Sequence, residues 1–113
     1  MADRLVPVLV ALGGFLGATS RYLLGTVVAG AGGTLLANVL GSLALALAVG
    51  LVRSTRLRFF LATGLLSSFT TYSTFAVETA TLGPTLGAAN VAANYALGFA
   101  AALLGLLVGR RWS

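Results

Sequence analysis

The chain of 113 residues is 58% hydrophobic, only 8% charged, and carries a net charge of +5. About a quarter of the residues of a soluble domain are charged, so this chain has too few polar side chains to cover a soluble surface. We therefore expect one all-α transmembrane domain over residues 1–113. Because the chain has no cysteine, no histidine and only two carboxylates, disulfides, zinc sites, hydrolytic triads and an enzyme function are not expected.

The first half of the chain predicts two transmembrane helices, because a charge-free run of roughly 20 mostly apolar residues can cross a bilayer. The first helix is expected over residues 5–28 and the second over 33–52. A flexible glycine-rich turn at 29–33 joins them, and a basic loop at 53–58 follows the second. These two helices form the first half of a four-helix membrane fold.

The second half predicts two further transmembrane helices, over residues 59–80 and 86–109. A Gly-Pro turn at 82–85 separates them, and Pro84 suits the start of a helix. Four helices of this size enclose little interior. An ion pathway or a polar cavity is therefore expected to need more than one subunit.

Small residues spaced four apart occur in the first and fourth predicted helices, as Gly13 with Gly17 and as Gly105 with Gly109. Such spacing lets helix backbones approach closely in a membrane, where packing rather than hydrophobicity drives association. These glycines are expected at contacts between helices.

Arginines gather on one side of this topology. With four crossings, both termini and the 53–58 loop share a side, and the loops on the other side hold no Lys or Arg. The arginines of the first side are Arg4, Arg53, Arg56, Arg58, Arg110 and Arg111. The positive-inside rule predicts that both termini are cytoplasmic in the dominant orientation of a multi-pass protein of the cell membrane. No basic face or motif predicts nucleic-acid binding.

The stretch SSFTTYSTF, residues 67–75, places seven hydroxyls inside the third predicted helix. In a regular helix they surround the circumference and cannot all face one partner helix. Either the hydroxyls bond back to carbonyls one turn earlier, or the helix is broken, which frees backbone groups that can bind ions. Because Ser and Thr are poor helix formers, the sequence favours the break. Tyr72 and Phe75 could meet a small anion with their ring edges, or simply pack.

Other polar side chains also lie within the predicted helices, where each needs a partner. Asn38 could bond between helices or offer its amide to an anion. Asn90 and Asn94 share one helix face, either as interhelical contacts or as the lining of a pathway. Arg21 could extend to the membrane interface, attract an anion in a vestibule, or hold a subunit contact.

Residues 63–75, TGLLSSFTTYSTF, resemble the third-helix motif of the Fluc (CrcB) family of fluoride channels, and 13–22, GGFLGATSRY, resemble its first-helix signature. The second and fourth helices match at Gly33, Thr34, Asn38, Gly41, Asn90, Asn94 and Gly98. The motifs follow in order over almost the whole chain. The resemblance implies a passive, fluoride-selective channel that exports cytoplasmic fluoride and lowers its toxicity. It also implies antiparallel dimers of dual-topology type, whose subunits have four helices with the third one broken.

The resemblance further implies a central sodium ion at the dimer interface, held by the backbone carbonyls of Ser67 and Thr70. It implies a fluoride pathway whose residues are two aromatics, two amides, two hydroxyls and one basic residue near the vestibule. At matching positions these are Tyr72, Phe75, Asn38, Asn94, Thr71, Ser73 and Arg21.

Two positions depart from the family pattern. The family usually has Gly at the position of Ser67 and Phe at the position of Tyr72. Serine is less free than glycine to adopt a positive φ, and Tyr72 adds a hydroxyl to the ring. The strong arginine bias also predicts insertion mainly in one orientation. The partner in an antiparallel dimer is therefore either a second copy or an oppositely oriented paralogue.

Two other functions fit a four-helix membrane protein. A small proton-coupled multidrug exporter needs a carboxylate in the membrane to carry the proton, and Glu78 lies near the end of the third predicted helix. An accessory membrane subunit, including one of a heterodimeric fluoride channel, needs no transport of its own. The hydroxyl-rich stretch favours a transport function over a purely structural one.

Overall fold

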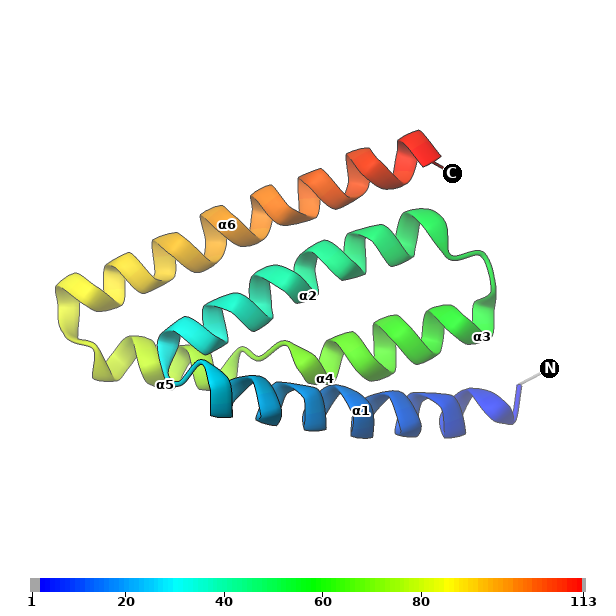
Figure 1. The fold of residues 1–113 in the computed structure, drawn as a ribbon, viewed down its shortest axis with the longest axis horizontal. Helices are drawn as coiled ribbons and strands as arrows, with labels where there is room; N and C mark the ends of the chain where they lie inside the picture. Colours follow the sequence, from blue (N-terminus) through cyan, green and yellow to red (C-terminus); the bar gives the residue numbers. More distant parts are fainter. Residues whose placement is uncertain (1–2, 113) are drawn as a thin grey trace.

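The computed structural model describes residues 3–112, in which all regular structure is helical. The elements are α1 (Leu5–Val27), α2 (Ala31–Leu51), α3 (Thr55–Arg58), η1 (Phe59–Leu66), α4 (Ser67–Phe69), α5 (Ser73–Thr81) and α6 (Gly83–Trp112). In Figure 1, α3, η1, α4 and α5 follow one another as a third rod, and each rod runs antiparallel to the rod before it in the chain. The molecule measures 50 × 31 × 25 Å, so its long axis is that of the helices.

Three of the helices, α1, α2 and α6, are long and apolar enough to cross a membrane. Their outward side chains are apolar, as at Phe15 and Phe99, which are each 68% exposed, and at Val27, which is 82% exposed. An outer surface of this kind belongs in lipid or against another apolar surface.

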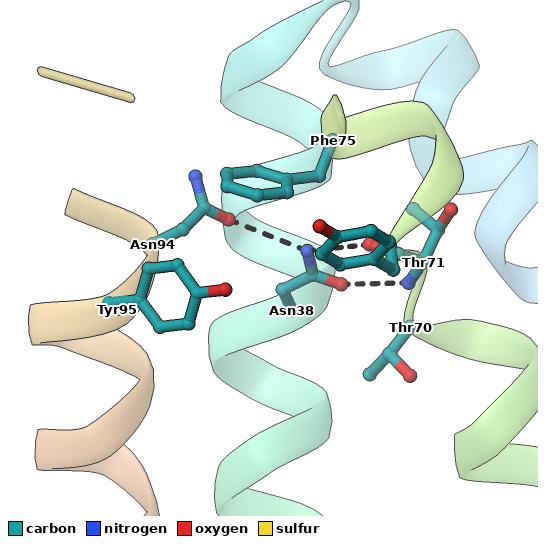
Figure 2. Close-up of a pocket in the computed structure, with 7 residues that line it drawn as sticks. Asn38, Thr70, Thr71, Phe75, Asn94 and Tyr95 are labelled. Carbon is teal, nitrogen blue, oxygen red and sulfur yellow. Dashed lines mark hydrogen bonds between the residues drawn. The ribbon is translucent and has the colours of Figure 1, made fainter. Parts of the chain in front are cut away.

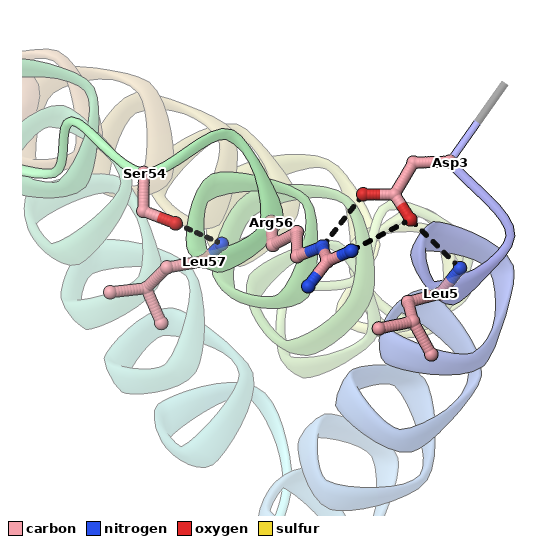
Figure 3. Close-up of polar contacts among 5 residues, drawn as sticks. All are labelled: Asp3, Leu5, Ser54, Arg56 and Leu57. Carbon is pink, nitrogen blue, oxygen red and sulfur yellow. Dashed lines mark hydrogen bonds and ion pairs between the residues drawn. The ribbon is translucent and has the colours of Figure 1, made fainter. Parts of the chain in front are cut away.

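The third rod differs in its bounds from the broken helix expected over 59–80. It begins earlier, at Thr55, because the Ser54 hydroxyl accepts a hydrogen bond of 3.3 Å from the Leu57 N–H and caps the first turn (Figure 3). The loop predicted at 53–58 was therefore wrong for the helical residues Thr55–Arg58. The eight residues of η1 then form a π-helix, a rare geometry that is frequent at functional sites.

The other connections are also tighter than the sequence predicts. The turn expected at 29–33 shrinks because α2 already begins at Ala31, after Gly30 takes a φ of 72°. The last helix exceeds the predicted 86–109 at both ends. Gly83, with a φ of 85°, makes the corner, and Pro84 follows it in the first turn, where proline has no N–H to leave unpaired.

Glycines bring the rods into backbone contact, as expected for the small-residue pairs. Gly13 and Gly17 of α1 are buried against η1, and a Cβ on Gly64 would lie only 2.7 Å from the Val10 carbonyl oxygen. A Cβ on Gly105 of α6 would lie 2.7 Å from the Ala46 Cβ of α2. The core is accordingly thin, because small residues fill the space between rods.

Candidate functional site

The third rod loses helical geometry between α4 and α5, at residues 70–72. Thr70 has an extended backbone, with a φ of −80° and a ψ of 158°, and α5 begins at Ser73. The hydroxyls before this point do bond back to earlier carbonyls, from Ser67 to Thr63 and from Thr70 to Leu66 at 3.0 Å. The hydroxyl-rich stretch therefore combines back-bonded hydroxyls with a non-helical segment.

The side chain of Asn38 on α2 pairs with the backbone of this segment. Its Oδ1 accepts a 2.9 Å hydrogen bond from the Thr71 N–H, and its Nδ2 donates one of 3.0 Å to the Thr71 carbonyl. One amide thus satisfies both backbone groups of a residue that has left the helix. Figure 2 shows this pair, with the Asn38 Nδ2 also directed at Asn94, whose Oδ1 is 3.4 Å away.

A chain of hydrogen bonds continues from Asn94 along α6 to α5. The Asn94 Nδ2 donates to the Asn90 carbonyl at 2.8 Å and to its Oδ1 at 3.1 Å. The Asn90 Nδ2 donates to the Thr79 Oγ1 at 2.9 Å, and that hydroxyl donates to the Phe75 carbonyl at 2.8 Å. These amides tie three rods together inside an apolar molecule.

Aromatic rings line up beside the amides. The ring centroids of Tyr72 and Phe75 are 5.9 Å apart, and those of Phe75 and Tyr95 are 6.1 Å apart at an interplanar angle of 87°. Phe75 is buried, with 7% of its surface exposed, whereas Tyr72 is 73% and Tyr95 47% exposed. The row of rings therefore leads from the interior of the chain to its surface.

These groups surround a cavity of about 250 Å³. Its lining residues are Asn38, Thr70, Thr71, Tyr72, Phe75, Asn94 and Tyr95. No charged side chain is among them, so the cavity is lined by amides, hydroxyls and aromatic rings, and the amide N–H groups are bonded within the protein. Figure 2 shows Asn94 and Tyr95 reaching it from α6, opposite the Thr70 and Thr71 side. Such a neutral, partly polar cavity can hold a small ion without neutralising it.

The remaining predicted pathway residues lie outside this cavity lining. The Ser73 Oγ is 3.5 Å from the Thr71 Oγ1, which accepts a 3.1 Å hydrogen bond from the Thr74 N–H at the start of α5. Arg21 points to the beginning of α2, where its Nη2 donates to the Thr34 Oγ1 at 2.8 Å. Its Nε is buried without a hydrogen-bond partner among the described residues. Arg21 and the cavity are thus separate features.

The carbonyl groups of Ser67 and Thr70 lie where the helical ladder stops. Within residues 3–112, no backbone N–H outside the helices donates to either carbonyl oxygen. Ser67 has a φ of −66° and a ψ of −29°, which serine adopts without strain. Serine in place of the family's usual glycine therefore causes no backbone strain at this position of the subunit.

Most of the helical domain matches one family model. The model described as "CrcB-like protein, Camphor Resistance (CrcB)" covers residues 8–106. The chain belongs to the CrcB family. With its long apolar helices, this member of the family is a multi-pass membrane protein.

Curated CrcB relatives are similar over much of the chain. A relative from Rhodococcus jostii, named "Fluoride-specific ion channel FluC 1", is 43% identical over 103 residues, which cover 90% of this chain and 83% of the relative. One from Hyphomonas neptunium, named "Fluoride-specific ion channel FluC", is 40% identical over 119 aligned positions, which cover 91% of this chain and 94% of the relative. "Fluoride-specific ion channel FluC 2" of Halobacterium salinarum is 54% identical over 82 residues, which span 67% of this chain and 64% of that relative.

Sequence reasoning missed two members of this CrcB site. Tyr95 lines the cavity, and Thr79 links Asn90 to the carbonyl of Phe75. Thr79 lies four residues after Phe75, so both share one face of α5, and this spacing is visible in the sequence. Tyr95 directly follows Asn94, but nothing in the sequence says that its ring turns toward Phe75.

Proposed function

We propose that the chain is a subunit of a fluoride-selective channel that lets cytoplasmic fluoride leave passively down its electrochemical gradient and so lowers fluoride toxicity. The observation that carries this proposal is the uncharged cavity, in which amides of Asn38 and Asn94 face the rings of Tyr72 and Phe75. The printed names of the CrcB relatives, fluoride-specific ion channels, supply the ion.

The chemistry of the cavity suits conduction of a small anion. Hydroxyls and the positive edges of aromatic rings each attract an anion weakly. An Asn38 N–H can join them when it gives up its 3.4 Å contact with the Asn94 Oδ1. Conduction requires an ion to leave each site as readily as it enters, and an arginine in the cavity would hold the anion too strongly. Thr71 and Ser73 contribute hydroxyls beside the Asn38 amide, and Arg21 serves near the vestibule rather than within the cavity.

We propose that the active form is an antiparallel dimer. The exposure of Tyr72 and Tyr95 leaves the cavity open on one side of a single subunit, and a second subunit would close it. The arginine bias between the two ends favours one orientation for this chain, with its termini in the cytoplasm. Its partner is then an oppositely oriented paralogue, and a second copy is the alternative.

A sodium ion at the dimer interface is part of the proposal. Sodium is a hard cation that prefers oxygen ligands, as calcium and magnesium do. The described residues contain no group of three His, Cys, Asp or Glu side chains that could hold a metal. The carbonyl oxygens of Ser67 and Thr70 accept from no backbone N–H outside the helices in residues 3–112, which leaves them available as ligands. Two such carbonyls from each subunit would complete a four-oxygen site.

Fluoride efflux from liposomes tests the main proposal. Vesicles that contain the purified chain, alone or with an oppositely oriented paralogue, are loaded with fluoride or with chloride, and release is followed with ion-selective electrodes. Fluoride but not chloride is expected to leave. The channel proposal fails if neither preparation releases fluoride faster than protein-free vesicles.

Asn38→Asp tests the site. The substitution keeps the acceptor for the Thr71 N–H but places a carboxylate in the cavity, so we expect fluoride efflux to fall by at least about tenfold through charge repulsion. Asn90→Asp makes the same chemical change at a residue that does not line the cavity, and a smaller loss is expected there. Equal efflux from wild type and Asn38→Asp would remove Asn38 from the pathway.

One observation favours a proton-coupled exporter of organic cations as the second candidate. The Oε1 of Glu78 is buried and has no hydrogen-bond donor among the described residues. Such an exporter would accumulate an organic cation in vesicles under a pH gradient, and Glu78→Gln would abolish that uptake. The channel proposal expects no such uptake from the wild type.

A further inference from the structure

Among the described residues, the arginine-rich end of the molecule carries more arginines than side-chain carboxylates. Figure 1 shows the N-terminus, the α2–α3 connection and the C-terminus at this end, and all six arginines there are exposed. The carboxylate at this end is Asp3, and it already binds Arg56 at 2.7 and 3.3 Å (Figure 3). The only other carboxylate of the described residues, Glu78, lies in α5. The surplus charge calls for anions from outside the chain.

A groove opens beside this charge, between the end of α2 and the start of the third rod. It has a volume of about 300 Å³ and is lined by Val49, Thr55, Arg58, Phe59, Ala62 and Thr63. The Arg58 Nη2 donates a 3.2 Å hydrogen bond to the Val49 carbonyl, which holds the guanidinium at the groove. Thr55 and Arg58 lie at the start of the third rod, and Phe59, Ala62 and Thr63 follow them along it, with Val49 of α2 also in the lining. Beyond the polar start the lining is mostly apolar, with the Thr63 hydroxyl as the exception.

We propose that this groove binds an anionic phospholipid. The phosphate lies against the Arg58 guanidinium, which has donors left beyond the one given to Val49, and the Thr55 hydroxyl lies beside it. Arg53, also exposed, adds positive charge nearby. One acyl chain follows Val49, Phe59 and Ala62. The order of groups matches a phospholipid from headgroup to chain, and the positive charges of Arg58 and Arg53 select an anionic headgroup over a zwitterionic one.

The proposal is independent of what the channel conducts, and native mass spectrometry tests it. The purified protein is mixed with equal amounts of phosphatidylglycerol and phosphatidylcholine, and the retained lipid is counted. Phosphatidylglycerol is expected to be retained preferentially. Arg58→Gln should lower its retention about fivefold, the effect of one arginine at an anionic membrane surface. Arg4→Gln removes the same charge at the same end but does not line the groove, so it should change retention much less.

Two further variants separate the headgroup from the chain. Arg58→Lys keeps the charge without the planar fork and should retain an intermediate amount of lipid, which also provides a folded variant if Arg58→Gln is unstable. Ala62→Trp fills the mostly apolar part of the groove and should release the lipid. Equal retention of the two lipids by wild type would overturn the proposal, as would equal losses in Arg58→Gln and Arg4→Gln. Dissociation of a dimer by Ala62→Trp with lipid retention unchanged would assign the groove to a second copy of the chain instead.

Discussion

The helices α2 and α6 meet along their length, and the two halves of their contact are built differently. Toward the arginine-rich end, a Cβ on Gly50 would lie 3.0 Å from the Gly109 Cα, so backbone touches backbone. Toward the other end, amides of Asn38 and Asn94 lie 3.4 Å apart beside a cavity of about 250 Å³. Small residues remove the space between helices, whereas amides hold the helices and leave room between them.

The physical reason lies in what each kind of contact requires. Glycine and alanine contacts need only shape, and their stabilisation comes from close packing in a setting where lipid is as apolar as the side chains. An amide inside the membrane needs every donor and acceptor paired. The Asn38 amide meets this need by pairing with the non-helical Thr71, so the polar half depends on the loss of helix in the third rod.

The largest loss of stability is expected where an added methyl group would push α2 and α6 apart at their glycine contacts. Gly105→Ala places a Cβ 2.7 Å from the Ala46 Cβ and 2.8 Å from the Leu43 carbonyl oxygen, and should lower the free energy of unfolding by about 3 kcal/mol. Gly98→Ala, on the same helix, brings a Cβ to 3.8 Å from the Ser42 Oγ and should cost less than about 0.5 kcal/mol. Unfolding of both variants in detergent measures this, and equal midpoints would refute the contrast.

A smaller loss of stability is expected when the Asn38 amide, at the centre of the polar half of the α2–α6 contact, is removed. Asn38→Ala leaves the N–H and the carbonyl of Thr71 without their partner and should cost about 2 kcal/mol of unfolding free energy. Ser42→Ala, one turn further along α2, removes only a local hydrogen bond to the Asn38 carbonyl. Its cost should stay below about 0.5 kcal/mol. If the two variants unfold alike, the amide is not what holds the segment.

Thr79, at the far end of the hydrogen-bond chain from Asn38, should contribute less to stability than Asn38 does. Thr79→Val removes the hydroxyl that accepts from Asn90 and donates to the Phe75 carbonyl, and should cost about 1 kcal/mol. Thr81→Val is the matched control, since the Thr81 hydroxyl also donates to carbonyls of its own helix, at 2.8 and 3.1 Å, but joins no second helix. Unfolding midpoints should move for Thr79→Val and not for Thr81→Val.

The smallest effect is expected from the exposed ion pair of Asp3 and Arg56, which contrasts with the amides in its access to water. The hydrogen bond from Arg56, with the one from the Leu5 N–H, holds the pKa of Asp3 below its ordinary value of 3.8. A lowered carboxyl pKa contributes stability that is complete above the ordinary value and is lost as the pH falls through the lowered one.

Asp3→Asn should therefore remove a slight acid dependence of the unfolding midpoint below about pH 4 and leave the midpoint at neutral pH almost unchanged. Salt should weaken the wild-type effect in the same way, because the pair is exposed to water. A large shift at neutral pH would contradict this.

The local features of the fold followed from the sequence. Charge-free apolar runs predicted the rods, Pro84 marked the start of the last helix, and the pairs Gly13 with Gly17 and Gly105 with Gly109 marked contacts between helices. The ends of the elements were less predictable. Thr55 to Arg58 look like a basic loop, yet the Ser54 cap lets them continue into the third rod as helix. A single hydroxyl at a helix end decides such a boundary.

The residues of the candidate site could be predicted only in part from the sequence. The sequence showed that Asn38, Tyr72 and Asn94 are costly inside a membrane, because each polar group there needs a partner. It did not show that Tyr95 lines their cavity, or that Arg21 turns to Thr34 instead. Which partner a side chain finds depends on how the rods are placed against one another.

By itself, the sequence determined that the chain is a membrane protein, which segments form its helices, and which few residues cannot face lipid. Composition and local spacing set all three. Only the tertiary structure decided that Asn38 closes on Thr71, 33 residues away in the chain. Each amide had several possible partners, and the close approach of α2, α6 and the third rod leaves it with one set.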